Sequence, residues 1–192
     1  MSYKEYLNIV EELPKHRGIE IKSKKFNEND FLKEMNRDKY VNIKCLEKGE
    51  ELMIVLVGDI VGADNIRGLI HSFTKSTDSI HNVIIISDEK RKESIVKFSD
   101  SEKYDYTDVR YYNHNHMKIC FPKSDLVPKH IILTPEEASR VKNIHMLNNS
   151  EFPIISSKDP LSLWLGFKPG DLIMIERVSE NSGTNIMYRM CQ

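Results

Sequence analysis

The stretch Leu52–Val57, which reads LMIVLV and ends at Gly58, decides the fold of the first half of the chain. A run of six apolar residues without a polar interruption is typical of a strand that is covered on both faces. An apolar stripe at helical spacing follows at 66–73, and a second apolar run occupies 83–86. The order strand, helix, strand, with a helix long enough for a crossover, predicts a parallel βαβ pairing.

Other periodicities in the first 124 residues predict helices at 3–13, 28–36 and 89–98, and strands at 41–45 and 117–121. We expect Pro14 to shorten the first helix, because proline lacks the backbone N–H and clashes with the preceding turn. Asn27 or Asn29 is the expected N-cap of the second helix. Three of its side chains are expected to turn inward: Phe31, Leu32 and Met35.

Turn and cap signals become dense after Pro122, and 124–128 has the composition of a linker. Thr134-Pro135-Glu136-Glu137 predicts a capping box, and Asp159-Pro160 predicts a second helix start that Gly166 closes. Pro169-Gly170 predicts a type II turn before a hairpin of strands 172–177 and 184–190. The whole chain is therefore predicted as α+β with two lobes, an N-terminal α/β lobe with a mixed sheet over 1–124 and a small C-terminal α+β lobe over 125–192.

Charge and cysteine content exclude some classes of protein. The 192 residues carry a formal net charge of -1, so general basicity cannot drive binding to nucleic acid or membranes. No stretch approaches the roughly 18 apolar residues of a membrane span, and the first residues lack the layout of a signal peptide. Cys45, Cys120 and Cys191 are an odd, widely spaced set, which favours a reducing, intracellular location.

One local cluster of positive charge stands out, and its members are Lys15, Arg17, Lys22, Lys24 and Lys25. Such a patch can contact a phosphate backbone without reading the bases. A solvated charged surface explains the same residues equally well, so both interpretations stay open.

Two patterns could carry metal chemistry. Asp59 follows one apolar run, while Asp88 and Lys90 follow the next, an order compatible with Mg²⁺-dependent nuclease chemistry. Acidic residues also commonly occur where strands meet solvent, and we favour that explanation. His114 and His116 alternate near Cys120, but a fourth ligand has no obvious source. We therefore expect no metal, no cofactor and no catalytic residue.

Several motifs in the C-terminal lobe occur in one characteristic order, and together they resemble a known family. They are Leu126-Val127-Pro128-Lys129-His130, Leu133-Thr134-Pro135-Glu136-Glu137-Ala138, Asp159-Pro160, Leu165-Gly166-Phe167-Lys168-Pro169-Gly170-Asp171, Ile175-Glu176-Arg177-Val178-Ser179-Glu180, Gly183 and Tyr188-Arg189. This order resembles the fifth subunit of eukaryotic DNA-directed RNA polymerase and its shorter archaeal counterpart. The looser N-terminal match is similar to the two-lobed eukaryotic type, and Trp164-Leu165-Gly166 combined with Ile175-Glu176-Arg177 and Ser179-Glu180 is more similar to versions in large DNA viruses.

The resemblance implies a non-catalytic subunit of a multisubunit polymerase. Its C-terminal lobe would dock on the largest subunit, and its jaw-like N-terminal lobe would lie near downstream DNA and contact only the backbone. The implied location is the nucleus for a cellular protein, and a virion or cytoplasmic viral factory for a viral one. The alternative function is the Mg²⁺-dependent nuclease that would use Asp59, Asp88 and Lys90.

Residues of the matched motifs are the expected contacts with the largest subunit. Arg177 and Arg189 can make bidentate, charge-assisted bonds to a partner, and a large aromatic such as Trp164 suits an interface anchor. Trp164 and Tyr188 could instead be core, with the arginines as internal braces. The complete expected set is Pro128, Lys129, His130, Trp164, Arg177, Ser179, Tyr188 and Arg189, and the basic cluster is the expected DNA-proximal set.

Overall fold

The computed structural model describes residues 1–58, 80–87, 108–179 and 183–192. The chain divides into two compact units, an N-terminal unit of Met1–Cys120 and a C-terminal unit of Phe121–Gln192. Each unit contains one mixed β-sheet together with helices, which confirms the predicted α+β class. The predicted helices at 66–73 and 89–98 lie outside the described residues. No helix in the described ranges combines the length and apolarity that a membrane crossing requires.

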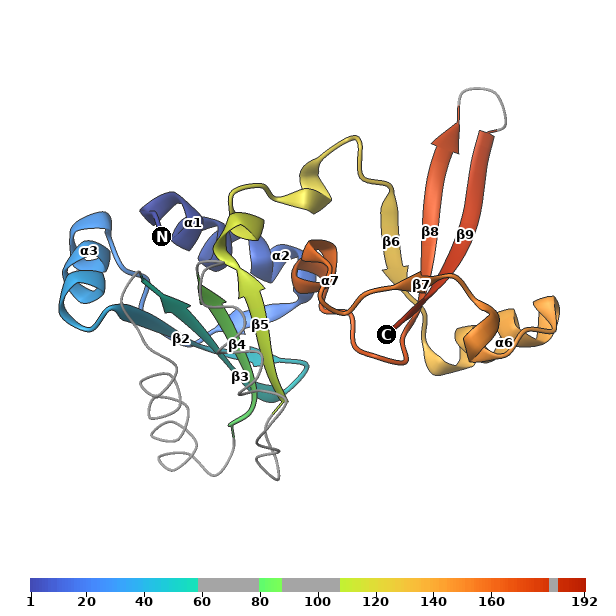
Figure 1. Cartoon of the computed structure of the whole chain (residues 1–192), viewed down its shortest axis with the longest axis horizontal. Coiled ribbons are helices and arrows are strands. Elements are labelled where there is room, and N and C mark those ends of the chain that lie inside the picture. Colours follow the sequence, from blue (N-terminus) through green and yellow to red (C-terminus); the bar gives the residue numbers. More distant parts are fainter. Residues whose placement is uncertain (59–79, 88–107, 180–182) are drawn as a thin grey trace. The chain divides into compact units, whose positions relative to one another are not determined.

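A five-stranded sheet forms the N-terminal unit, in the order β1-β2-β3-β4-β5 (Figure 1). Its strands are β1 (Ile19–Ile21), β2 (Tyr40–Glu47), β3 (Glu50–Val57), β4 (Ile80–Ser87) and β5 (Asp108–Asn113). β1, β2 and β3 pair antiparallel, whereas β3, β4 and β5 run parallel. The parallel β3–β4 pair confirms the prediction drawn from the two apolar runs. Successive residues of β3 from Leu52 to Val57 are all at most 3% exposed, so both of its faces are covered.

The opening helix continues past Pro14 to Arg17, so the expected early end was wrong. It consists of α1 (Tyr3–Leu7), the π-helical turn η1 (Asn8–Glu12) and α2 (Leu13–Arg17). In η1 the N–H of Leu13 bonds to the carbonyl of Asn8, five residues back, which widens the turn just before the proline. A widened turn relieves the clash that a proline ring causes in an α-helix. Gly18 then ends the helix in the left-handed conformation, with φ 69°.

The second helix, α3 (Glu28–Arg37), has as its N-cap Asn27, one of the two residues predicted for this role, and the Asn27 side chain accepts a hydrogen bond from the N–H of Asp30. Phe31 is fully buried as expected, but Leu32 is 46% exposed and therefore points outward. The predicted strand at 117–121 was wrong. A single-turn 3₁₀ helix, η3 (His114–Met117), follows β5, and a second one, η4 (Phe121–Lys123), opens the C-terminal unit.

A four-stranded sheet forms the C-terminal unit, in the order β6-β8-β9-β7. Its strands are β6 (Lys129–Ile132), β7 (Ile154–Ile155), β8 (Leu172–Ser179) and β9 (Gly183–Cys191). The helices are α6 (Pro135–His145), η5 (Asn149–Glu151) and α7 (Pro160–Leu165). The predicted caps are confirmed. Thr134 makes a capping box, Asp159 accepts from the N–H of Leu161, and Gly166 ends α7 with φ 73°.

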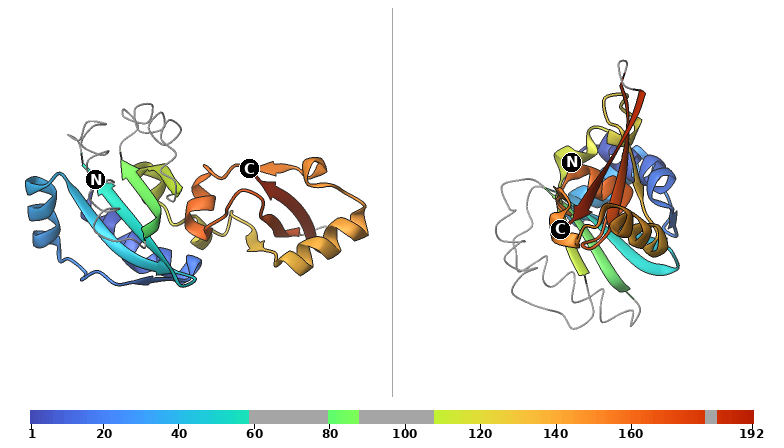
Figure 2. Two further views of the ribbon diagram at one scale, coloured as in Figure 1. Left: turned by 90° about the horizontal axis from the view of Figure 1, so that it is seen from below. Right: turned by 90° about the vertical axis from the view of Figure 1, so that its right-hand side faces the viewer.

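Alternation along β8 and β9 divides the core of this unit between the two faces of the sheet. On one face, Leu172 and Met190 pack with Ala138 of α6 and with Phe152. On the other face, Ile173 and Ile175 pack with other apolar residues, including Phe167, Ile155 and Cys191. Figure 2 shows α6, in orange, beside the strands of this sheet.

The β8–β9 hairpin extends past its neighbours. β6 pairs with β8 only from Ile173 to Glu176, and β7 pairs with β9 only at Met190 and Cys191. Within the described residues, the outer part of the hairpin is therefore a two-stranded ribbon. Its large apolar side chains are open to solvent, with Val178 81% exposed and Ile186 53% exposed.

A buried ion pair connects the opening helix to the sheet. The Nε of Arg17 lies 2.5 Å from Oε1 of Glu47, and its Nη2 lies 3.0 Å from Oε2. The two side chains are only 1% and 8% exposed. We expect Arg17→Met to destabilise the protein by about 3–5 kcal/mol, because it leaves the carboxylate of Glu47 buried without its countercharge. Urea unfolding followed by circular dichroism measures this change.

The control is Lys22→Met, which breaks the exposed pair between Lys22 and Glu20. Its cost should stay below about 1 kcal/mol, because surface ion pairs contribute little. Equal effects of the two substitutions would contradict a special role for the buried pair.

Candidate protein-binding pocket

A pocket of about 320 Å³ lies in the C-terminal unit. Its residues come from the segment before β6, from β6, β7, β8 and β9, and from the start of α7. They are Pro128, His130, Ile155, Asp159, Leu161, Ile175, Arg177, Met187 and Arg189. Five apolar side chains, including the ring of Pro128, give the pocket an apolar lining, while two arginines, one histidine and one aspartate supply polar groups.

Strand register places these side chains together. Ile175 pairs with His130 of β6 on one side and with Met187 of β9 on the other. Arg177 lies two positions after Ile175, and Arg189 lies two positions after Met187. Both arginines are therefore on the same face of the sheet as Ile175 and Met187. That face also contains the cluster around Ile173 and Phe167, so the pocket continues the apolar core outward.

The two arginines retain hydrogen-bonding capacity. Arg177 is exposed, and its side chain has no hydrogen bond or ion pair with other described residues. Arg189 donates from Nη1 to the carbonyl of Ile154 at 3.3 Å, while its Nε is buried and meets no acceptor in the described part of the chain. An unsatisfied buried donor is costly, so a ligand that supplies an acceptor here would be favoured.

Asp159 does not neutralise the two arginines. Its Oδ1 accepts a hydrogen bond from the N–H of Leu161, 2.8 Å away, because it is the N-cap of α7. With one carboxylate against two guanidinium groups, the pocket favours anionic or carbonyl groups on a partner. Guanidinium groups bind such acceptors with two parallel hydrogen bonds, which gives orientation as well as affinity.

The surroundings of His130 favour its neutral form. Burial lowers its pKa from the ordinary 6.5, a hydrogen bond to the carbonyl of Pro128 opposes this shift, and the charge of Arg189 adds to it. Nδ1 lies 2.6 Å from that carbonyl oxygen, so it must carry the proton, and Nε2 of the neutral ring is an acceptor.

We expect His130 to titrate below pH 6.5 in an NMR titration of its ring protons. Since the unfolded chain binds this proton more tightly than the folded chain, His130 should reduce stability as pH falls through 6.5 towards the folded pKa. Replacement by Gln, in His130→Gln, should remove that part of the pH dependence. A midpoint at or above 6.5 would contradict the buried environment of the ring.

The expected partner-binding residues do not all lie in this pocket. Pro128, His130, Arg177 and Arg189 line it. Lys129 forms an ion pair with Glu176 at 3.2 Å, on the opposite face of the sheet. Tyr188 also belongs to that opposite face, where it packs against the core cluster of α6 and lies 5.6 Å from the ring of His145.

Trp164 is 0% exposed, which favours the alternative that it is core over its assignment as an interface anchor. Ser179 ends β8 opposite Gly183. The pocket also contains residues that the sequence analysis missed, chiefly Ile155, Asp159, Leu161, Ile175 and Met187. The i, i+2 spacing of Ile175 with Arg177, and of Met187 with Arg189, was the available signal. Only the pairing of the strands shows that these two pairs adjoin.

The basic cluster of the N-terminal unit is largely paired with carboxylates. Lys15 lies 3.0 Å from Glu12, Lys22 lies 2.5 Å from Glu20, and Lys25 pairs with Glu11. The hydrogen bond to Glu11 raises the pKa of Lys25. Arg17 is buried against Glu47, so its assignment as a DNA-proximal residue is corrected: its guanidinium cannot reach a phosphate without breaking that pair.

The remaining sequence-predicted sites differ in outcome. Asp59, Asp88 and Lys90 lie outside the described residues, so the nuclease arrangement stays a prediction. His114 and His116 occupy the 3₁₀ helix η3 and not a strand, so strand alternation does not bring their side chains together. Nδ1 of His114 lies 3.4 Å from a carboxylate oxygen of Glu5.

Comparison with known proteins identifies the class of the chain. Residues 121–191 match the family model described as RNA polymerase Rpb5, C-terminal domain. A Dictyostelium discoideum protein named DNA-directed RNA polymerases I, II, and III subunit rpabc1 is 31% identical over 100 residues, which are 52% of this chain and 49% of that protein. Subunit Rpo5 of Thermofilum pendens is 46% identical over 66 residues, which are 34% of this chain and 82% of that subunit.

A viral protein is similar as well. The RPB5 homolog of African swine fever virus is 35% identical over 81 residues, which are 42% of this chain and 40% of the viral protein. The chain thus spans about half the length or less of these eukaryotic and viral relatives, but most of the archaeal one. The class defined by these matches is that of DNA-directed RNA polymerase subunits. Within this class, the chain belongs to the Rpb5/Rpo5 family.

Proposed function

We propose that this chain is a non-catalytic subunit of a multisubunit DNA-directed RNA polymerase and that its C-terminal unit docks on the largest subunit. The observation that carries this proposal is the pocket within the family-matched unit, where Arg177 and Arg189 present donors beside an apolar lining. A charged group next to fully packed apolar residues is the usual composition of an interface hot spot. The catalytic site would lie on other subunits.

The chemistry of the pocket defines the segment that would bind. An apolar side chain would insert among Ile155, Leu161 and Met187. A neighbouring carboxylate or backbone carbonyl would accept hydrogen bonds from the arginines. The neutral ring of His130 offers an acceptor at Nε2 for a donor on the same segment. Pro128, whose carbonyl accepts the hydrogen bond from the ring of His130, would act by orienting that ring.

The N-terminal unit is proposed to lie near downstream DNA and to contact only its backbone. Of the basic cluster, Lys24 is exposed and has no carboxylate partner among the described residues. Lys15, Lys22 and Lys25 sit in exposed pairs, which cost little to break when a phosphate replaces the carboxylate. The protein would work in the nucleus if it is cellular, and in a virion or cytoplasmic viral factory if it is viral.

Arg177→Ala tests the docking role. We expect it to weaken co-purification with the largest polymerase subunit by about tenfold or more, as loss of a central arginine does at a protein interface. Affinity pull-down at moderate salt, quantified against wild type, measures the effect. Because Arg177 is exposed, the isolated chain should keep its circular dichroism spectrum.

Arg140→Ala is the matched control, since Arg140 is an exposed arginine of the same unit on α6, away from the pocket. It should leave co-purification unchanged. Docking through another face would be indicated if Arg177→Ala co-purified like wild type.

Replacement of Lys22, Lys24 and Lys25 by Ala tests the DNA role. We expect less crosslinking of this subunit to downstream DNA in the assembled polymerase. The salt dependence of DNA binding should also become shallower, by about 0.9 in the log–log slope for each phosphate that a lysine no longer neutralises. The control removes three other exposed lysines of the same unit, Lys4, Lys33 and Lys118. Equal crosslinking for both triple variants would mean that the basic cluster is only a solvated surface.

A further inference from the structure

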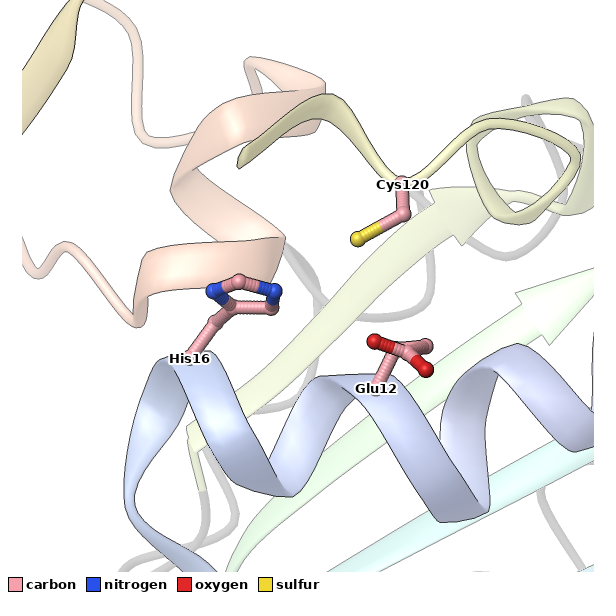
Figure 3. Close-up of side chains that lie close together, drawn as sticks. All are labelled: Glu12, His16 and Cys120. Atoms are coloured by element: carbon pink, nitrogen blue, oxygen red, sulfur yellow. The ribbon is translucent and has the colours of Figure 1, made fainter. Parts of the chain in front are cut away.

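Three side chains with metal-binding chemistry meet in the N-terminal unit, away from the pocket described above. Glu12 ends η1, His16 lies in α2, and Cys120 is the last residue of the unit (Figure 3). One carboxylate oxygen, one imidazole nitrogen and the sulfur all lie within 4.8 Å of one another. All three residues are partly exposed.

Cys120 reaches Glu12 and His16 because the segment before it packs along the opening helix. Residues 114–120 run along the opening helix and contact it at regular intervals. His114 meets Glu5 at 3.4 Å, and the carbonyl of Met117 accepts a hydrogen bond from Nδ2 of Asn8 at 2.5 Å. The next turn of the helix presents Glu12 and His16, four residues apart and therefore on one face. Cys120, three residues after Met117, is the residue that reaches them.

The set of donor atoms favours one ion. A thiolate, an imidazole and a carboxylate are the ligand types of zinc, and a thiolate disfavours Mg²⁺ and Ca²⁺. With bonds of roughly 2.0–2.3 Å, the ligand atoms of a tetrahedral zinc site lie roughly 3.5 Å apart. Side-chain torsion changes that bring the ligand atoms up to about 1.3 Å closer together would give this spacing. The carboxylate and thiolate together balance the charge of Zn²⁺.

We propose that Glu12, His16 and Cys120 bind one Zn²⁺, with a water molecule as the fourth ligand. The ion would fasten the end of the N-terminal unit to its opening helix. Lys15 contacts Glu12 at 3.0 Å but is 61% exposed, and an exposed pair of this kind is too weak to compete with a metal bond. This proposal stands independently of the proposed polymerase role.

Cobalt provides the test, because Co²⁺ occupies zinc sites and reports a bound thiolate through an intense charge-transfer absorption. We expect the full-length chain, freed of metal with a chelator, to develop this absorption at one equivalent of Co²⁺ and to lose it on addition of Zn²⁺. Cys120→Ser and His16→Gln should each weaken Co²⁺ binding more than tenfold. Loss of a residue that only hydrogen-bonds to a metal ligand already lowers metal affinity by about tenfold or more, and these two residues are ligands themselves. Lys15→Gln, a neighbouring substitution that keeps all three ligands, should retain the absorption.

Alkylation of the unmutated chain gives a second measurement that needs no variant. Cys45 and Cys191 are buried, and burial raises the pKa of the Cys45 thiol to about 12, so Cys120 should be the thiol that reacts. Zn²⁺ should then protect Cys120 from iodoacetamide. The proposal is overturned if no charge-transfer absorption develops, if Cys120→Ser leaves it intact, or if Zn²⁺ fails to slow alkylation. The last result would indicate an ordinary thiol beside a histidine.

Discussion

The antiparallel register of β8 against β9 is the constraint on which the C-terminal unit depends. By pairing Ile173 with Arg189 and Ile175 with Met187, it sends one alternate set of side chains to each face of the sheet. One face closes against α6 and contains no pocket residue, whereas the other combines an apolar core with two arginines. A slip of β9 by one residue against β8 would turn Met187 and Arg189 to the face that packs against α6, while Arg177 of β8 stayed on the other face. The chemistry of the pocket is therefore a consequence of strand pairing, and no single motif encodes it.

Local signals in the sequence were sufficient for much of the fold. The caps at Asn27, Thr134 and Asp159, and the left-handed glycine Gly166, depend on residues within one turn, and all four lie where they were predicted. The apolar runs likewise predicted the parallel pair β3–β4. Pro14 misled because a proline rule written for α-helices does not anticipate a π-turn that widens the helix before it. Residues 117–121 alternate like a strand, but they connect the end of η3 to the start of η4, because they follow the opening helix and not the sheet edge.

The sites were harder to predict, because their residues meet through distant parts of the chain. Sequence reasoning could not foresee that Glu47 removes Arg17 from the basic cluster, since the pair joins a helix to a strand 30 residues away. It also associated Cys120 with His114 and His116, its neighbours in sequence, whereas the structure places it beside Glu12 and His16. Of the expected partner-binding residues on strands, His130, Arg177 and Arg189 all line the pocket. Lys129 and Tyr188 alternate to the other face, and no motif distinguishes the two sets.

The two-stranded outer part of the β8–β9 hairpin has a consequence for how the protein exists in a cell. Ordering each of its residues costs conformational entropy, and the largely exposed side chains of Val178 and Ile186 contribute little hydrophobic burial to offset that cost. The backbone edge of β8 beyond Glu176 carries hydrogen-bonding groups that no described strand covers, and such an edge adheres to other edges of the same kind. Copies of the chain on which nothing covers this edge would therefore tend to aggregate with one another.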